Sequence, residues 1–200
     1  MNQEFLNVLA TPISAVANLL VPEDLAALRE ACDELFGEQS GDKHGFNCDV
    51  WSSYKAHNVK SDERFAAINS GVAAFTQLMQ NEFCKEQEVR LFDGWVNRYG
   101  PHQHQEVHSH GNFMWSAVYY VDMPEGSSPL CMLNKNFPDR DIESDSDVWA
   151  RTQKLMPSEN TLIIFPSNVY HYVPVGTNVT HRTSIAYNFE LGEPFEKVVK

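Results

Sequence analysis

Two histidines separated by one residue, His108 and His110, carry the clearest chemistry in this sequence. In an extended strand, side chains two positions apart lie on the same face, so both imidazoles can reach one metal ion. Neutral imidazole is the commonest protein ligand of first-row transition metals. A third histidine, His171, follows an apolar run and a Pro-Ser corner in the segment F-P-S-N-V-Y-H. These three histidines are the predicted ligands of one metal ion.

A second candidate ligand pair lies just upstream. His104 and Glu106 form an H-x-E pair with the same parity as His108 and His110, so one extended strand would place all four on one face. His110 lies six residues before Ser116, which suits a ligand pair followed by a short loop and a strand that lines a pocket. The H-x-E pair needs a loop about four residues longer. The spacing favours His108 and His110, and it leaves His104 with Glu106, or a solvated polar strand without metal, as alternatives.

Arg182 begins another strand-like run, R-T-S-I-A-Y-N-F, and is its only charged residue. A buried guanidinium without a partner is costly, so Arg182 needs an anion beside it. The planar guanidinium binds a carboxylate through two parallel hydrogen bonds. An acid of the chain itself, in an internal salt bridge, is one source of that anion.

The order of these motifs resembles the Fe(II)/2-oxoglutarate oxygenases. More closely, it resembles a family of short oxygenases with H-x-H, a following S-x-V-Y-Y, F-P-S-x-x-x-H and R-x-S-x-x-x-N. The resemblance covers roughly residues 90–190, about half of the chain. In most of these oxygenases the second ligand is a carboxylate, and His110 takes that position here.

The resemblance implies that the three histidines hold Fe(II) and that Arg182 binds the distal carboxylate of 2-oxoglutarate, the cosubstrate. It also implies that Ser184 and Tyr120 add hydroxyl donors to this carboxylate. The implied reaction is the oxidation of a substrate C–H bond, coupled to the conversion of 2-oxoglutarate to succinate and CO2. With His110 in place of a carboxylate the ligand set is neutral, which should lower affinity for hard cations and shift the redox potential.

Two other classes of protein fit parts of the pattern. A cupin-like three-histidine enzyme would act without 2-oxoglutarate, and Pro166 followed by His171 fits the second motif of that class. However, the first cupin motif requires a glutamate where this chain has Met114 and Trp115, and cupins do not require Arg182. A non-catalytic jelly-roll binding protein would have the same fold without any catalytic activity.

Composition excludes several functions. The chain has 200 residues, 42% of them hydrophobic and 21% charged, as is ordinary for a globular protein. The formal net charge is −12 and there is no block of Lys or Arg, so a nucleic-acid partner is not expected. The four cysteines form no C-x-x-C pair, and the N-terminal apolar run is broken by Asn7, Pro12 and Asn18. We therefore expect a cytoplasmic protein with reduced thiols and no membrane span.

Two helical patterns precede residue 89. The first begins at Pro22, with two acids in its first turn, and ends at Gly37. The second runs from Ser61, a good N-cap, to about residue 83. We expect its apolar stripe to pack on a sheet: Phe65, Ile68, Val72, Phe75 and Met79. Short strands are expected within 4–10 and 13–20 and near 50–52.

From Val89 onward the pattern changes to short apolar runs separated by turn residues: V-R-L-F-D-G-W-V-N-R-Y, S-A-V-Y-Y-V, L-C-M-L, T-L-I-I-F, Y-H-Y-V-P-V and R-T-S-I-A-Y-N-F. Such spacing indicates an antiparallel sandwich or barrel. The predicted fold is mainly β with supporting helices (α+β), a double-stranded β-helix (jelly roll) with N-terminal helices packed on the sheet. We expect a single domain, 1–200, with 1–88 as its strand and helical support and 89–192 as its jelly-roll catalytic core.

Three further expectations concern the surroundings of the site. A two-residue turn at Gly176-Thr177 would pair His171 with Arg182. His181 has the opposite parity and should face away from the site. Residues 134–159 form a long acidic insert without strand pattern, and we expect this insert to help cover a small-molecule or peptide substrate.

Overall fold

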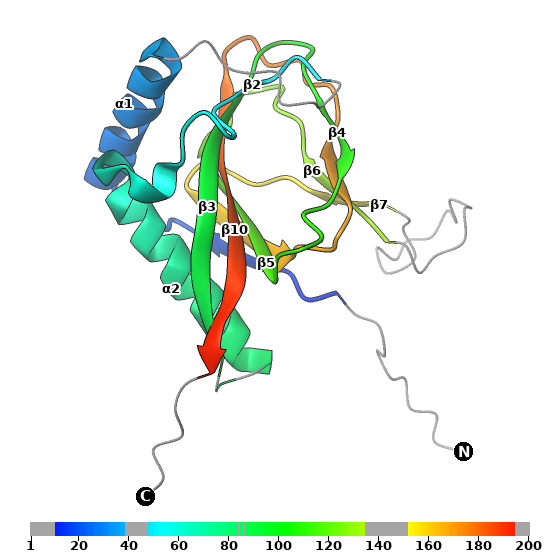
Figure 1. The fold of residues 1–200 in the computed structure, drawn as a ribbon. Coiled ribbons are helices and arrows are strands. Elements are labelled where there is room, and N and C mark those ends of the chain that lie inside the picture. The colour runs from blue at the N-terminus through cyan, green and yellow to red at the C-terminus, as the bar shows by residue number, and fades with distance from the viewer. Residues whose placement is uncertain (1–10, 39–47, 84, 86, 135–151, 195–200) are drawn as a thin grey trace, which may run out of the picture.

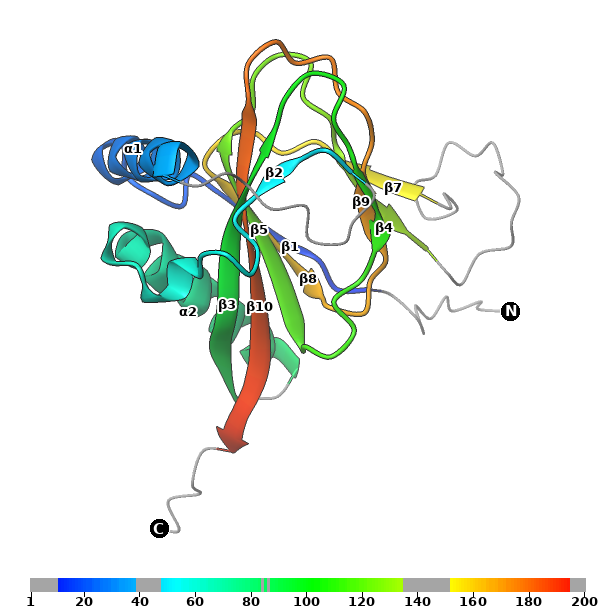
Figure 2. The ribbon, with the colours of Figure 1, turned by 45° about the horizontal axis from the view of Figure 1, so that its top comes forward.

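The computed structural model describes residues 11–38, 48–83, 85, 87–134 and 152–194. These residues form three layers: a pair of helices, a six-stranded sheet and a four-stranded sheet (Figures 1 and 2). The prediction of a mainly β fold with supporting helices is confirmed. Two antiparallel sheets face each other, as a jelly roll requires.

Both sheets are antiparallel throughout. The larger sheet has the order β1-β8-β5-β10-β3-β2, and the smaller sheet has the order β4-β9-β6-β7. The strands are β1 (Ser14–Ala17), β2 (Trp51–Ser52), β3 (Gln87–Tyr99), β4 (Gln105–His108), β5 (Trp115–Asp122), β6 (Leu130–Leu133), β7 (Thr152–Leu155), β8 (Thr161–Pro166), β9 (His171–Val173) and β10 (Arg182–Pro194).

The helices lie side by side on the outer face of the larger sheet (Figure 2). They are α1 (Pro22–Glu38) and α2 (Ala66–Phe83), and two short 3₁₀ turns, η1 (Val59–Ser61) and η2 (Glu63–Phe65), precede α2. The second helix was therefore predicted correctly, although its first residues form these 3₁₀ turns. Its apolar stripe packs into the main core, as expected. At the far end of α2, Gln80 accepts a hydrogen bond from the indole N–H of Trp115 on β5, at 2.8 Å.

The alternation of side chains along β5 and β10 divides the two faces of the larger sheet. Odd-numbered residues of both strands enter the core beneath the helices: Trp115, Ala117, Tyr119, Val121, Ile185, Tyr187 and Phe189. Even-numbered residues face a cavity between the two sheets: Val118, Tyr120, Arg182, Ser184, Ala186 and Asn188. Tyr120, Arg182 and Ser184, which the sequence singled out for their chemistry, therefore share the face opposite the helices.

A β-bulge in β3 changes which residues of that strand face the cavity. Asn188 pairs with Asp93, but the next residue of β10, Phe189, pairs with Leu91, so Phe92 is the extra residue. A bulge re-aims the side chains that follow it. Val89 lies in the helix-side core before the bulge and Val96 lies there after it. Odd-numbered positions from residue 93 onward thereby turn to the cavity.

Two expectations require correction. His171 does not pair with Arg182, because β9 belongs to the smaller sheet and pairs with β4 and β6. The insert at 134–159 contains a strand, β7, whose partner is β6, whereas it was expected to be irregular. The strand expected at His108 is present as β4, but it ends at that residue and does not include His110. The remaining insert residues 135–151, and the strand expected within 4–10, lie outside the described residues.

None of the helices in the described segments has the length and apolarity that a membrane span requires. The three described cysteines, Cys32, Cys48 and Cys131, are free thiols, as expected. Cys84 lies outside the described residues.

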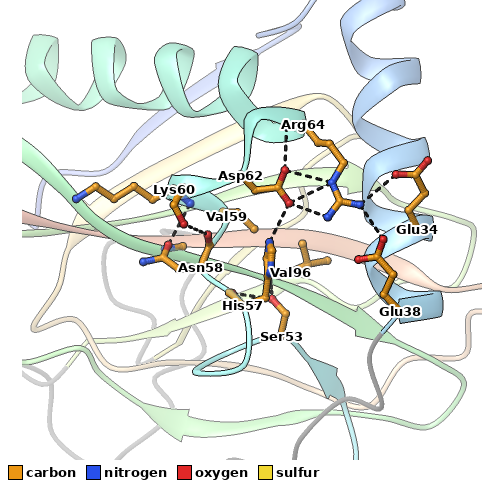
Figure 3. Close-up of polar contacts among 12 residues, drawn as sticks. Glu34, Glu38, Ser53, His57, Asn58, Val59, Lys60, Asp62, Arg64 and Val96 are labelled. Carbon is orange, nitrogen blue, oxygen red and sulfur yellow. Dashed lines mark hydrogen bonds and ion pairs between the residues drawn. The ribbon is translucent and has the colours of Figure 1, made fainter.

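A polar network ties α1 to the segment that leads into α2 (Figure 3). The carboxylate of Asp62 accepts hydrogen bonds from the Arg64 guanidinium, at 2.7 Å, and from the backbone N–H of Arg64, at 3.0 Å. It also lies 2.9 Å from Nε2 of His57. Arg64 in turn reaches Glu34 and Glu38 on α1. The network anchors the segment whose earlier residues, from β2 onward, line the cavity between the sheets.

Replacing Asp62 by alanine is expected to lower the free energy of unfolding by about 1–2 kcal/mol, because the variant loses both a helix cap and an ion pair. The Arg64 guanidinium lowers the pKa of Asp62 to about 2, below its unfolded value. The stabilisation is therefore complete at neutral pH and is lost as the pH falls from about 4 to about 2. Urea unfolding of both proteins across this range measures the difference. A difference that does not shrink in acid would contradict the assignment, and Glu34→Ala, which removes an exposed partner of Arg64, is the control.

Candidate metal centre

Three histidines from separate segments meet at one end of the cavity. His108 ends β4, His110 lies two residues beyond it, and His171 begins β9. Their candidate ligand nitrogens all lie within 4.8 Å of one another. His108 and His171 are direct register partners across the β4–β9 pair, and their ring centroids are 4.3 Å apart. The structure thus brings together the three histidines that the sequence proposed as ligands.

The hydrogen bonds of the rings orient them for metal binding. Nδ1 of His108 lies 2.8 Å from the carbonyl oxygen of Glu106, and Nδ1 of His171 lies 2.9 Å from that of Val169. A carbonyl oxygen only accepts, so both rings carry their proton on Nδ1. Nδ1 of His110 lies 2.5 Å from Oδ1 of Asn188, which assigns the same tautomer. In this tautomer Nε2 carries the lone pair that a metal ion needs.

Burial keeps the three imidazoles neutral. Burial, together with the unfavourable interaction with His108 and His110 that a protonated ring would have, lowers the pKa of His171 to about 3. Burial also lowers the pKa of His110 to about 4, against the opposing effect of the hydrogen bond to Asn188. The pKa of His108 is lowered by the same cause. Neutral imidazole is the form that binds a metal ion, so these rings can bind without first releasing a proton at neutral pH.

The loop that carries His110 is fixed by its backbone. The N–H of His110 donates to the carbonyl oxygen of Ser167, at 2.8 Å, and the N–H of Met114 donates to that of Phe189, also at 2.8 Å. The Ser167 hydroxyl lies 2.8 Å from the hydroxyl of Ser116. Ser167 of the F-P-S-N-V-Y-H segment therefore positions His110 through its backbone carbonyl. The same segment ends at His171.

The cavity beside the histidines has a volume of about 180 Å³ and extends between the two sheets. Its lining includes all six residues proposed from the sequence: His108, His110, His171, Arg182, Ser184 and Tyr120. Arg182 and Ser184 lie at the start of β10, which pairs with β3 and β5. Aromatic rings form part of the remaining wall: Tyr54, Trp95, Tyr99 and Phe113.

Arg182 is a buried cation without an anionic partner among the described residues. Its side chain is 2% exposed, and neither Nε nor Nη1 has a hydrogen-bond partner. No described carboxylate forms an ion pair with it. The guanidinium carbon lies 4.6 Å from the ring centroid of Tyr99 and 5.2 Å from that of Tyr120. The hydroxyl of Tyr120 is also buried without a partner.

These orphaned donors fit a dicarboxylate such as 2-oxoglutarate. A buried guanidinium and a buried hydroxyl without acceptors are costly unless a ligand supplies the acceptors. Burial raises the pKa of the Tyr120 hydroxyl, so this group remains a donor at neutral pH. A carboxylate seated between them would accept hydrogen bonds from both side chains. An internal salt bridge, the alternative considered for Arg182, is not formed within the described residues.

The alternative ligand pair is not part of this cluster. His102 has a positive φ of 63° and β4 begins only at Gln105, so the run does not continue as one extended strand. A register shift between Gln105 and His108 further breaks the alternation. Neither His104 nor Glu106 lines the cavity. His181 lies in a different surface depression, with Arg98 and Asp122, and so faces away from the site, as expected.

Three residues of the site were not assigned a role from the sequence. Asp93, Asn188 and Ser116 lie on neighbouring strands in one cross-strand row. Nδ2 of Asn188 donates to Asp93, at 2.9 Å, and the Ser116 hydroxyl lies 3.1 Å from Nδ1 of His110. Burial raises the pKa of Asp93, and the hydrogen bond from Asn188 opposes this shift. Asn188 and Ser116 could have been found by parity with Arg182 and Tyr120. Asp93 could not, because the bulge at Phe92 reverses which residues of β3 face the cavity.

Comparison with known protein families agrees with the geometry of the metal and cosubstrate sites. Residues 93–188 match the model of a family described as "Putative 2OG-Fe(II) oxygenase". No match is found among curated proteins. The matched segment contains the whole histidine cluster and Arg182.

Solved structures share the fold. A prolyl-4-hydroxylase from Pseudomonas putida has a TM-score of 0.64 at 18% identity, covering 91% of this chain and 94% of that one. A prolyl hydroxylase from Trichoplax adhaerens, in complex with a hypoxia inducible factor peptide fragment, has a TM-score of 0.65 at 13% identity, covering 89% and 83%. HygX from Streptomyces hygroscopicus, with nickel and 2-oxoglutarate bound, has a TM-score of 0.63 at 12% identity, covering 90% and 83%.

These likenesses establish the double-stranded β-helix predicted from the sequence. The sequence match adds the chemistry that a shared fold alone does not carry. Residues 93–188 therefore belong to the Fe(II)/2-oxoglutarate oxygenases, enzymes whose metal is Fe(II) and whose cosubstrate is 2-oxoglutarate.

Proposed function

We propose that His108, His110 and His171 hold Fe(II), and that Arg182 binds the distal carboxylate of 2-oxoglutarate. The observation that carries this proposal is the buried guanidinium of Arg182, which has no described anionic partner and faces the same cavity as the histidine cluster. When bound, the iron and the keto acid supply the oxidation of a substrate C–H bond, coupled to formation of succinate and CO2.

Each chain residue has a separate task in this assignment. The three imidazoles offer Nε2 to the metal because their Nδ1 protons are engaged elsewhere. Arg182 orients the cosubstrate from the far end, with Tyr120 and Ser184 as hydroxyl donors beside it. Three protein ligands would leave room at the metal for the keto end of the cosubstrate.

The substrate is expected to enter along the aromatic wall next to His110. The ring centroids of Tyr54 and Trp95 are 4.7 Å apart, and those of Trp95 and His110 are 5.6 Å apart. A wall of this kind excludes water and seats an apolar group beside the metal. We propose a small-molecule or peptide substrate with an apolar C–H group. The net charge of −12 argues against nucleic acid.

We further propose a cytoplasmic location. Free thiols at Cys32, Cys48 and Cys131 fit a reducing compartment. We also propose that the acidic insert helps to cover the substrate; its residues 135–151 lie outside the described residues.

Formation of succinate from 2-oxoglutarate tests the proposed activity. Protein loaded with Fe(II) without oxygen and then exposed to O2 with 2-oxoglutarate is expected to release succinate and CO2 in equal amounts, followed by NMR. Release should depend on the metal and should be lost in His171→Ala and Arg182→Ala, because these variants lack a ligand and the carboxylate partner, respectively. Metal binding without any 2-oxoglutarate binding would instead support the alternative, a cupin-like three-histidine enzyme.

A further inference from the structure

His110 differs from the other two histidines in what its second nitrogen contacts. Nδ1 of His108 and Nδ1 of His171 donate to backbone carbonyl oxygens, which carry no net charge. Nδ1 of His110 instead donates to the side-chain oxygen of Asn188, at 2.5 Å. Nδ1 of His110 thus contacts a side chain, Asn188, which can itself form a hydrogen bond to a charged group.

Asn188 is connected to such a charge. Its Nδ2 donates to Oδ1 of Asp93, at 2.9 Å, so the chain of hydrogen bonds runs from the imidazole through an amide to a carboxylate. A carboxylate only accepts hydrogen bonds, so the NH2 group of Asn188 faces Asp93 and its oxygen faces Nδ1 of His110. The orientation of Asn188 is therefore fixed, and with it the tautomer of His110.

The backbone is built to bring these groups into line. Asn188 pairs with Asp93 on β3 and with Ser116 on β5, so the three side chains form a row across three adjacent strands. The bulge at Phe92 turns Asp93 to the cavity side, where an uninterrupted strand would have turned it toward the helices. The Ser116 hydroxyl donates to the same Asn188 oxygen, at 3.2 Å. Asn188 itself is 3% exposed.

We propose that Asp93 and Asn188 are positioning residues for His110, and that Asp93 lends the metal site, through Asn188, part of the negative charge that a carboxylate ligand would supply directly. The inference rests on the proposed role of His110 as a ligand. Hydrogen bonds in series polarise one another, and an imidazole whose N–H is drawn toward an anion is a stronger metal ligand. A neutral set of three imidazoles gains most from such a partner, because it has no charge of its own.

The test measures affinity for Co(II), a stable substitute for Fe(II), by titration of the metal-free protein. Asp93→Asn removes the charge and keeps the shape of the side chain, and we expect the Kd for Co(II) to rise about tenfold. Asn188→Ala breaks the chain of hydrogen bonds and is expected to raise the Kd by about 10- to 100-fold. Glu88→Gln is the matched control: it removes one carboxylate from the same strand, at a surface pair with Arg90, and should leave the Kd within about twofold.

A charge exchange separates this role from simple structural support. The double variant Asp93→Asn/Asn188→Asp keeps a hydrogen-bonded row of the same shape and moves the carboxylate one position closer to His110. We expect its Kd for Co(II) to return to within about threefold of the wild-type value. The midpoint potential of the iron-loaded protein should rise in Asp93→Asn, because lost negative charge disfavours Fe(III), and should fall again in the double variant.

The outcomes are distinct. An Asp93→Asn variant with wild-type Kd and potential would overturn the inference, and so would a double variant that binds no better than Asp93→Asn. Urea unfolding of each metal-free variant shows whether a weaker Kd reflects a folding defect. If wild type does not bind Co(II), or His110→Ala binds it as wild type does, the proposed ligand set itself is wrong. The failure of the proposed function is therefore distinguishable from failure of the Asp93–Asn188 role alone.

Discussion

Replacing His171 or His108 by alanine is expected to abolish stoichiometric binding of one divalent metal ion, with a loss of affinity greater than about 100-fold. The reason is direct: each histidine supplies one of the three protein ligands, and even residues behind the ligands contribute about 10- to 100-fold. Nδ1 of each ring donates to a backbone carbonyl oxygen, so in either variant the histidine that remains is held in its position. Anaerobic titration with Fe(II) or Co(II), followed by elemental analysis, measures the loss.

The same titration decides between the two ligand pairs proposed from the sequence. Glu106→Gln should leave the affinity for metal nearly unchanged, because Glu106 contributes its backbone oxygen to His108 and its side chain does not line the cavity. A loss well beyond about tenfold would make Glu106 the carboxylate ligand of an H-x-E site. His181→Ala is the control for histidine removal, since this ring packs against Phe36 outside the cavity. Undiminished binding in both His108→Ala and His171→Ala would remove the assignment.

The part of the candidate site on β10 was predictable because it depends on local parity. Arg182, Ser184 and Asn188 occupy even-numbered positions of β10, so they face one cavity. The odd positions between them are apolar and pack beneath the helices. For such a strand, the face of a residue follows from its neighbours, and a buried arginine stands out against them.

The structure brings together the three histidines that the sequence proposed as ligands, but through a geometry different from the one that the parity argument assumed. His110 does not lie on the strand with His108, and its ring is placed by the Ser167 carbonyl and by Asn188. Both groups are distant in sequence, so no local pattern could have indicated them. The closeness of His108 and His171 likewise comes from the β4–β9 pairing.

The errors have a common physical cause. Pairing His171 with Arg182 assumed a hairpin within one sheet, whereas the chain passes from the smaller sheet to the larger one between β9 and β10. Turn residues do not distinguish these two paths. The position of Asp93 was hidden by the bulge at Phe92, which leaves the apolar alternation of β3 out of phase along its length. Non-local pairing sets both features, and a single sequence does not report it.

Arg182→Ala is expected to raise the Kd for 2-oxoglutarate by about 30-fold or more while the metal stays bound. A charge-assisted bidentate contact in a buried site costs roughly 2–5 kcal/mol when truncated, and about 1.4 kcal/mol corresponds to tenfold in Kd. The side chain is 2% exposed, so water cannot replace the lost contact easily. Lysine at this position should restore binding only in part, because it supplies the charge without the planar fork.

Anaerobic titration of 2-oxoglutarate into metal-loaded wild type, Arg182→Ala and Arg182→Lys measures these differences. Arg90→Ala is the matched control, since it removes an arginine of neighbouring β3 that pairs with Glu88 at the surface. Both alanine variants should retain the metal, because neither arginine is one of the three candidate ligands. A wild type that binds metal but not 2-oxoglutarate, or an Arg182→Ala variant that binds it equally well, would contradict the role of Arg182. The buried guanidinium would then need another anion, and the cavity would take a different carboxylate or phosphate ligand beside the same three histidines.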